Sequence, residues 1–359
     1  MRAYSPNFLL FAVTLLLSCC HASSALPTES EVLSSLIIGS IEPSVTKMAD
    51  TAEQLEIRVH LLCEDPNAES LELARNAWRN AYLAWCQAAP FRFGPGNRLY
   101  RQIGQWFVNG VVLDAAVEST ELDDLLQQVE QRGYAAVEYL LFTPPDATAA
   151  TTTGRSAHLR ETTEEIAKLT ADVHLNWETH YADQFRSAGN GAPFLIQADA
   201  LSLFLSEVLN VTEHLLRDRI GVPSGFFEGA SKPDRLEAWK SHETIVGLQA
   251  TLVGLQLAIK GDGEASLVDL VATKDGLVEA RNPALAKAIR KQFDKIEKIL
   301  TTLRDEDLTL AVRLKKNPKT MKRLYGELQD LQDDLIEASL VLELDVHSGI
   351  QSMLTTETD

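Results

Sequence analysis

Apolar residues recur along this chain at helical spacing. From residue 28 onward they fall three and four positions apart, which is the spacing of one face of an α-helix. The stripe formed by Leu71, Ala74, Trp78, Tyr82 and Trp85 is an example. No run alternates with the period of two that a half-buried β-strand shows. The pattern therefore predicts an all-α protein.

Turn and capping residues divide the first half of this pattern into helices. Thr28-Glu29-Ser30-Glu31 has the spacing of a capping box, so a first helix is expected to begin there and to reach Cys63. Pro43 should bend it, because proline cannot donate the backbone hydrogen bond of the preceding turn. The second helix should follow the turn Asp65-Pro66-Asn67. After it we expect a structured loop over 89–104, helices over 118–131, 134–142 and 156–180, and a polar surface loop over 143–154.

The segment 184–194, QFRSAGNGAPF, is the best candidate for a domain boundary, because glycine and polar residues interrupt the helical pattern there. A second set of helical patterns covers 195–219, 233–260, 275–304 and 318–343, with interruptions at 221–235 and 263–274. The length suggests about two domains. We therefore expect two helical-bundle domains, each like a four-helix bundle, over residues 26–188 and 189–345, and a tail over 346–359.

The first 25 residues have the composition of an export signal. Arg2 precedes an apolar run from Phe8 to Leu17, which is too short to span a bilayer, and small residues follow it. Leu16-Leu17-Ser18-Cys19 resembles a bacterial lipobox, in which Cys19 becomes the lipidated N-terminus; an ordinary signal peptidase could instead cut after Ala25. We favour the lipobox. The protein is then exported, periplasmic and anchored to a membrane by a lipid.

The net charge excludes one class of function, and the positions of the cysteines bear on disulfide formation. A formal net charge of −18 at pH 7 repels nucleic acid, which excludes nucleic-acid binding. After residue 25 only Cys63 and Cys86 remain, and an oxidising compartment would favour a disulfide between them. On two helices joined at Asp65 they lie about 28 Å apart, whereas a disulfide needs Cα atoms within about 7 Å. We therefore expect two free, mostly buried thiols.

One carboxylate lies within the apolar stretch 133–142, GYAAVEYLLF. The residues three and four positions from Glu138 on either side are hydrophobic or small, so on a helix this acid lies among apolar side chains. A glutamate is seldom fully buried without a partner. The candidate partners are basic or hydroxyl side chains elsewhere in the chain: Arg92, Arg98, Arg101, Arg235, Lys240, Ser241 and His242.

Three patches of the sequence resemble the imelysin-like proteins of the bacterial cell envelope, a family named after an insulin-cleaving membrane protease. ARNAWRNAYLAWCQAAPFRFGP (74–95) is similar to a Trp-rich helix that leads into a Phe-Gly-Pro loop. QRGYAAVEYLLF (131–142) occupies the place of a Gly-x-His-x-x-Glu motif. RIGVP (219–223), followed by RLEAWKSHETIVGLQATLVGLQ (235–256), resembles a turn and a Glu-x-x-x-Ser helix of the second domain.

The resemblance implies two helical domains with a site where they meet, export with frequent lipidation, and an association with iron acquisition. It suggests an envelope protein that binds a small ligand or metal ion, with iron or haem as candidates and other iron-uptake proteins as partners. The polar site between the domains would contain Glu138, Arg92, Arg98, Arg101, Glu237 and Ser241. Glu138 could instead serve only to anchor the two domains to each other.

Ala135 departs from the family motif, which has histidine at this place. Histidine and glutamate three residues apart could share a metal ion, whereas alanine offers no lone pair, and catalytic zinc needs about three protein ligands. Glu138 is the only motif ligand retained, so zinc is disfavoured, no catalytic residue is assigned and enzyme activity is the weaker interpretation. His214 lies two turns beyond Glu207, and we attribute this spacing to chance. A metal-dependent peptidase of the imelysin type and a non-catalytic scaffold with a vestigial site remain the alternatives.

Overall fold

The computed structural model describes residues 27–106, 108–118, 131–191, 193–227, 229–261, 276–305, 309–316 and 318–346. Every regular element in these ranges is a helix and none is a strand, which confirms the all-α prediction. Among the described helices, none combines the length and the apolar character needed to span a bilayer. The export signal with Cys19, nearly all of the helix expected over 118–131, the segment 263–274 and nearly all of the tail lie outside the described residues.

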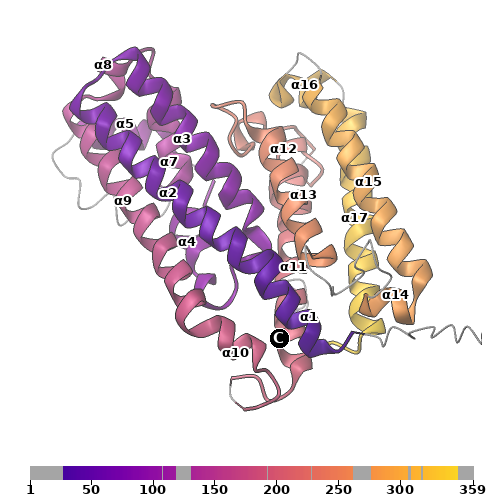
Figure 1. The fold of residues 1–359 in the computed structure, drawn as a ribbon. Helices are drawn as coiled ribbons and strands as arrows, with labels where there is room; N and C mark the ends of the chain where they lie inside the picture. The colour runs from indigo at the N-terminus through magenta and orange to yellow at the C-terminus, as the bar shows by residue number, and fades with distance from the viewer. Residues whose placement is uncertain are drawn as a thin grey trace, which may run out of the picture.

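The described first half of the chain forms long and short helices joined by turns and by the 89–104 loop (Figure 1). The expected capping box is present, with the Thr28 hydroxyl accepting from the Glu31 N–H and the Glu31 carboxylate accepting from the Thr28 N–H. The helix continues through a π-helical turn just before Pro43. The elements are α1 (Glu29–Leu36), η1 (Ile37–Ile41), α2 (Glu42–Glu64), α3 (Ala68–Gln87), η2 (Ala89–Phe91), η3 (Gly94–Gly96), α4 (Leu99–Ile103), α5 (Gly110–Glu118), α7 (Gly133–Phe142), α8 (Ala147–Ala150), α9 (Thr153–Asn176), η5 (Trp177–Tyr181) and α10 (Ala182–Arg186).

The described second half of the chain also consists of helices. A π-helical segment again interrupts its first long helix, at Leu215–Gly221. The described elements are α11 (Gln197–His214), η6 (Leu215–Gly221), α12 (Val222–Ser224), η7 (Pro233–Arg235), α13 (Thr244–Lys260), α14 (Leu277–Arg281), α15 (Pro283–Asp305), α16 (Leu310–Lys316) and α17 (Pro318–Val341). The division into domains over 26–188 and 189–345 stays a prediction.

The structure corrects three of the expected elements. The helix expected over 233–260 begins only at Thr244, because residues 236–243 form turns in which Ala238 and His242 have φ values of 53° and 65°; a right-handed helix has no such residues. The loop expected over 143–154 contains α8, which the Asp146 side chain caps. The helix expected over 275–304 is divided at Asn282, since the residue before a proline avoids the helical conformation.

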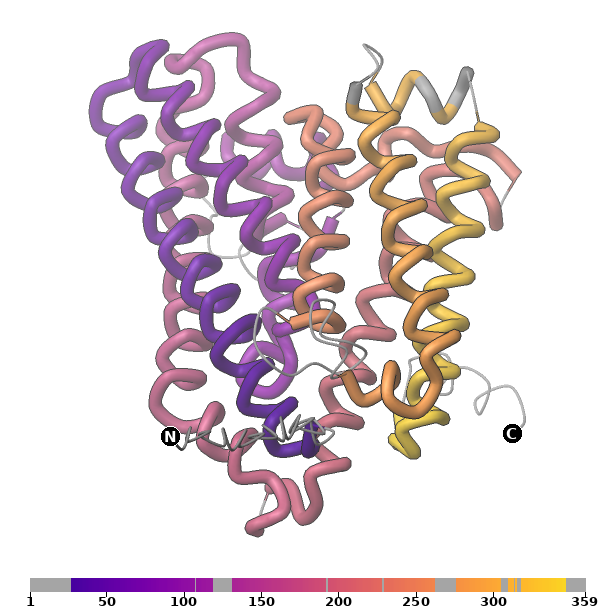
Figure 2. Tube along the Cα trace, turned by 45° about the vertical axis from the view of Figure 1, so that its right-hand side comes forward, coloured from indigo at the N-terminus to yellow at the C-terminus, as the bar shows by residue number. Residues whose placement is uncertain are grey.

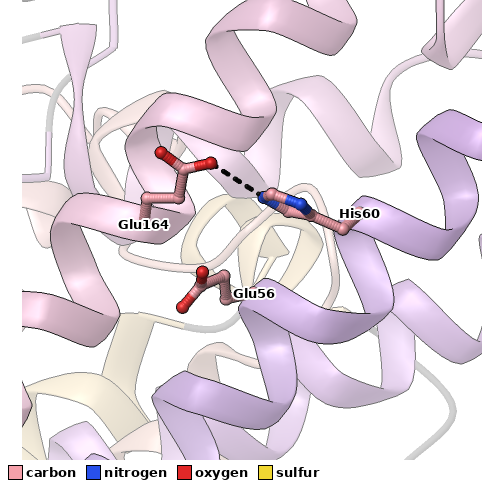
Figure 3. Close-up of side chains that lie close together, drawn as sticks. All are labelled: Glu56, His60 and Glu164. Atoms are coloured by element: carbon pink, nitrogen blue, oxygen red, sulfur yellow. Dashed lines mark ion pairs between the residues drawn. The ribbon is translucent and has the colours of Figure 1, made fainter.

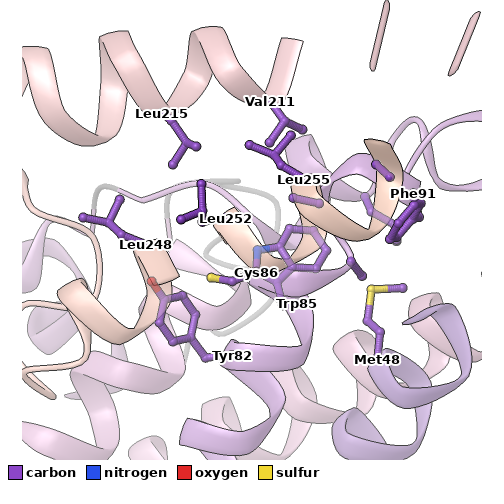
Figure 4. Packing of buried hydrophobic residues seen from close by; sticks show 14 of the residues in the cluster. Met48, Tyr82, Trp85, Cys86, Phe91, Val211, Leu215, Leu248, Leu252 and Leu255 are labelled. Atoms are coloured by element: carbon purple, nitrogen blue, oxygen red, sulfur yellow. The ribbon is translucent and has the colours of Figure 1, made fainter. Parts of the chain in front are cut away.

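One hydrophobic core connects the two sets of helices. In the first set α2 packs against α3 and α9, in the second α15 packs against α17, and α13 contacts both α3 and α15. Figure 2 shows α13, in orange, between the two sets. Figure 4 shows Tyr82 and Cys86 of α3 close to Leu248 and Leu252 of α13. Both described cysteines are free, as expected, with Cys86 buried and Cys63 partly buried.

Two glycines allow α13 to approach α3 closely. A Cβ atom added at Gly247 would lie 2.2 Å from the Tyr82 hydroxyl oxygen, and one added at Gly254 would lie 2.1 Å from the backbone carbonyl oxygen of Gln87. Residues seven apart lie on the same face of a helix. That face of α13 is therefore the one pressed against α3.

Gly254→Ala is expected to lower the free energy of unfolding by about 1–3 kcal/mol, because the Gln87 carbonyl belongs to the backbone and cannot rotate aside. Gly326→Ala is the matched control: no atom lies within 4 Å of its added Cβ, so alanine should stabilise α17 by up to about 1 kcal/mol. Urea unfolding followed by circular dichroism measures both changes. A Gly254→Ala protein as stable as wild type would contradict this packing.

Candidate functional site

Glu138 is buried where α7 meets the turns that precede α13. Its side chain is only 3% exposed, and its Oε1 atom accepts the backbone N–H of Ser241 at 2.8 Å and the Ser241 hydroxyl at 2.7 Å. Burial raises the pKa of Glu138 to about 7, while the Ser241 hydrogen bonds and the Lys240 charge oppose the increase. The partner among the expected candidates is thus a serine. The contact joins the two halves of the chain.

The turns over 236–243 explain how Ser241 reaches Glu138. The Glu243 N–H donates to the Ala238 carbonyl at 3.0 Å, and the Thr244 hydroxyl donates to the carbonyl of Glu237 at 2.7 Å. These bonds close the turns without using the Ser241 N–H. In a continuous helix from residue 233 that N–H would donate four residues back within the helix. The interruption of the helix is therefore what makes the contact possible.

Glu237, one turn earlier, faces a different partner. Its carboxylate forms an ion pair with Arg219 of η6, and both side chains are almost fully buried. Arg219 also donates to the Thr251 hydroxyl at 2.6 Å and to the Tyr82 hydroxyl at 3.1 Å. This cluster ties η6 and α13 of the second half to α3 of the first.

A cleft of about 540 Å³ opens between the 89–104 loop, η5 and one face of α11. Arg92 lies in its wall, where the guanidinium carbon is 3.7 Å from the centre of the Trp85 ring. The Arg92 Nη1 atom is shielded from solvent and has no hydrogen-bond partner among the described residues. Burial lowers the pKa of Arg92, and the Glu207 carboxylate opposes this. A buried cationic donor without a partner is costly, so this wall suits an anionic group.

Two side chains of α11 add titratable groups to the cleft. Burial raises the pKa of Glu207, and the Arg92 charge opposes the increase. The Nδ1 atom of His214 lies 2.9 Å from the Asp218 carboxylate. When Nδ1–H donates to that carboxylate, the Nε2 atom carries a lone pair that can bind a metal ion. The Tyr100 ring packs edge-on against His214, with the ring centres 5.0 Å apart.

The structure does not gather the six predicted site residues into one cleft. Arg98 and Arg101 are exposed on the 89–104 loop. The others lie in three places: Glu138 with Ser241, Glu237 with Arg219, and Arg92 in the cleft. Sequence reasoning missed Arg219 altogether and dismissed His214. The spacing of Glu207 and His214, seven residues apart on one helical face, was the one available indication that they line a common surface.

The chain is similar to several known proteins. A family model described as imelysin matches residues 41–337. Iron-regulated protein A of Synechococcus elongatus is 26% identical over 298 residues, which cover 78% of this chain and 77% of that protein.

Two crystal structures share the fold. One is a putative iron-regulated protein A precursor from Parabacteroides distasonis, with a TM-score of 0.78 and 18% identity, covering 89% of this chain and 97% of that one. The other is an imelysin-like protein from Psychrobacter arcticum, with a TM-score of 0.68 and 19% identity, covering 90% of this chain and 99% of that one.

Proposed function

The chain belongs to the imelysin family, and we propose that it is an exported cell-envelope protein of iron acquisition that binds its ligand in the cleft lined by Arg92, Glu207 and His214. The iron-regulated protein of Synechococcus elongatus supports the iron-related role. The relative from Parabacteroides distasonis, described as a precursor, supports export, in agreement with the signal expected over residues 1–25. A periplasmic location and a lipid at Cys19 are part of this proposal.

The observation that carries the ligand site is the unpartnered Nη1 atom of Arg92 in the wall of the cleft. A guanidinium group pairs most strongly with a carboxylate or phosphate, through charge-assisted hydrogen bonds. The cleft volume of about 540 Å³ lies within the range of small-molecule sites. An anionic ligand would satisfy the buried donor and leave the fold around it unchanged.

The remaining walls favour a ligand that carries iron. Haem iron is commonly held by histidine or tyrosine, and His214 and Tyr100 lie side by side in the cleft. Phe93 and Tyr181 add aromatic surface against which a flat ring system can pack. Haem, whose two carboxylates could pair with Arg92, is therefore the ligand we propose, and a smaller iron complex bearing carboxylates is the alternative.

Arg92→Gln is expected to weaken haem binding by about 10- to 100-fold, because a charge-assisted hydrogen bond contributes roughly 1.5–3 kcal/mol. Arg98→Gln is the matched control: it removes an exposed arginine of the same loop and should leave the affinity within about twofold. Isothermal titration calorimetry of the purified protein with haem, ferric citrate and ferrous iron measures the affinities and identifies the ligand.

Three results would contradict the proposal. Equal loss of affinity in the Arg92→Gln and Arg98→Gln proteins would show that the ligand does not use the cleft. Metal-dependent turnover of an unfolded protein that Glu138→Gln abolishes and Arg92→Gln leaves unchanged would favour the competing peptidase function. Absence of any binding or turnover would favour the scaffold alternative.

A further inference from the structure

Three side chains of metal-ligating type converge on the outer side of the first set of helices, away from the cleft. They are Glu56 and His60 of α2 and Glu164 of α9 (Figure 3). One ligand atom of each lies within 4.8 Å of the other two. The convergence has a simple structural cause. Glu56 and His60 are four residues apart and share a face of α2, and α2 packs along α9.

The ring of His60 faces a carboxylate that could share a cation with it. Its Nε2 atom is shielded from solvent, pairs with Oε1 of Glu164 at 3.0 Å, and makes no hydrogen bond to the described residues. Glu56 is partly buried beside it and Glu164 is exposed. Two carboxylates and one imidazole therefore face one point that is open to solvent on one side.

We propose that Glu56, His60 and Glu164 form a binding site for a divalent transition-metal ion such as Zn²⁺ or Fe²⁺. An imidazole together with carboxylates suits these borderline ions, whereas Mg²⁺ and Ca²⁺ prefer oxygen ligands alone. Ligand bonds of about 2.0–2.2 Å place the ligand atoms of one ion roughly 3–3.5 Å apart. The His60–Glu164 distance of 3.0 Å already meets that spacing, and a rotamer change of Glu56 completes the set.

The charged side chains around this cluster allow a cation to bind there. Arg160 is the neighbouring cation: its Nη2 atom lies 3.5 Å from the His60 carbonyl oxygen. The same atom is 4.0 Å from the carboxylate of Glu64, so the Arg160 charge is matched one turn further along α2. Two negative charges then remain at the site itself. A bound ion would leave at least one coordination position to water and would join α2 to α9.

The test is calorimetry of the purified protein with Zn²⁺, and with Fe²⁺ under anaerobic conditions. One ion per chain should bind to this site, and His60→Ala, Glu56→Gln and Glu164→Gln should each weaken it by at least about tenfold. Glu53→Gln, which removes an exposed carboxylate of α2, should leave the affinity unchanged. His214→Ala should also leave it unchanged, which distinguishes this site from the proposed haem cleft.

Thermal unfolding gives a second readout. Because the ion binds the folded chain and bridges two helices, saturating Zn²⁺ should raise Tm by about 3 °C or more in the wild type but not in the His60→Ala protein. Zn²⁺ affinity or a Tm increase in the three ligand variants that equals that of the wild type would overturn the inference. A Tm that does not respond to millimolar Zn²⁺ or Fe²⁺ would overturn it as well. Neither outcome bears on the cleft.

Discussion

Replacing Arg219 by methionine is expected to lower the free energy of unfolding by about 3–5 kcal/mol, because it leaves the Glu237 carboxylate buried without its partner. Methionine keeps much of the side-chain length, so lost packing contributes little. The Thr251 and Tyr82 hydroxyl groups would also lose the guanidinium to which they are hydrogen bonded. Urea unfolding at constant pH measures the change.

Two further variants separate the ion pair from other effects. Arg101→Met removes an exposed arginine of α4 and should change stability by no more than about 0.5 kcal/mol. Adding Glu237→Gln to Arg219→Met removes both charges and should recover a large part of the lost stability. The double variant could instead be less stable than Arg219→Met, by about as much as that single substitution costs. Glu237 would then have another partner, and our assignment would be wrong.

The stability of the protein is expected to fall by about 3 kcal/mol between pH 4.5 and pH 7 through Glu138 alone. Its folded pKa is about 7, against 4.5 as the ordinary value. Between these values the folded chain holds a proton on Glu138 that the unfolded chain has released, so stability decreases as pH rises. Below pH 4.5 both states are protonated and above pH 7 both are ionised, so this contribution becomes constant.

Glu138→Gln isolates this contribution. Glutamine has no titratable group but keeps an oxygen that can accept the Ser241 hydrogen bonds. The difference in unfolding free energy between variant and wild type should therefore shift in favour of the variant by roughly 2–3 kcal/mol from pH 5 to pH 8. Glu53→Gln, on the exposed side of α2, is the control and should keep the wild-type pH dependence. Parallel pH profiles for wild type and Glu138→Gln would disprove the raised pKa.

These two predictions concern neighbouring contacts with different chemistry. Glu237 forms an ion pair with Arg219, and this pair ties η6 to the turns before α13. Glu138 accepts hydrogen bonds from Ser241 and from the backbone N–H of Lys240, and burial still raises its pKa against these bonds and the nearby Lys240 charge. The contact region between the two halves therefore combines a buried ion pair with a buried carboxyl group whose ionisation lowers the stability of the folded chain.

Most of the functional prediction from sequence rests on the family resemblance. The resemblance located some of the site residues better than others. It put Glu138 and Ser241 into the same predicted polar site, and the structure places the Ser241 hydroxyl 2.7 Å from the Glu138 carboxylate. It also suggested arginines of the 89–104 loop, of which Arg92 alone lines the cleft. Arg98 and Arg101 follow at helical and turn positions that face solvent. A loop of short 3₁₀ and α turns has no single period from which inward and outward positions could be read.

In the part of the chain that the structure describes, local sequence determined the helices, their caps and the absence of strands, because side-chain spacing, capping boxes and proline act within a few residues. The Thr28 cap is an example. The tertiary structure alone decided which helices meet and which polar groups face one another. Glu164 joins Glu56 and His60 only because α9 packs on α2. The Ser241 N–H reaches Glu138 only because the helix pattern is broken before Thr244. Such pairings depend on packing between distant segments, and no periodicity within a segment encodes them.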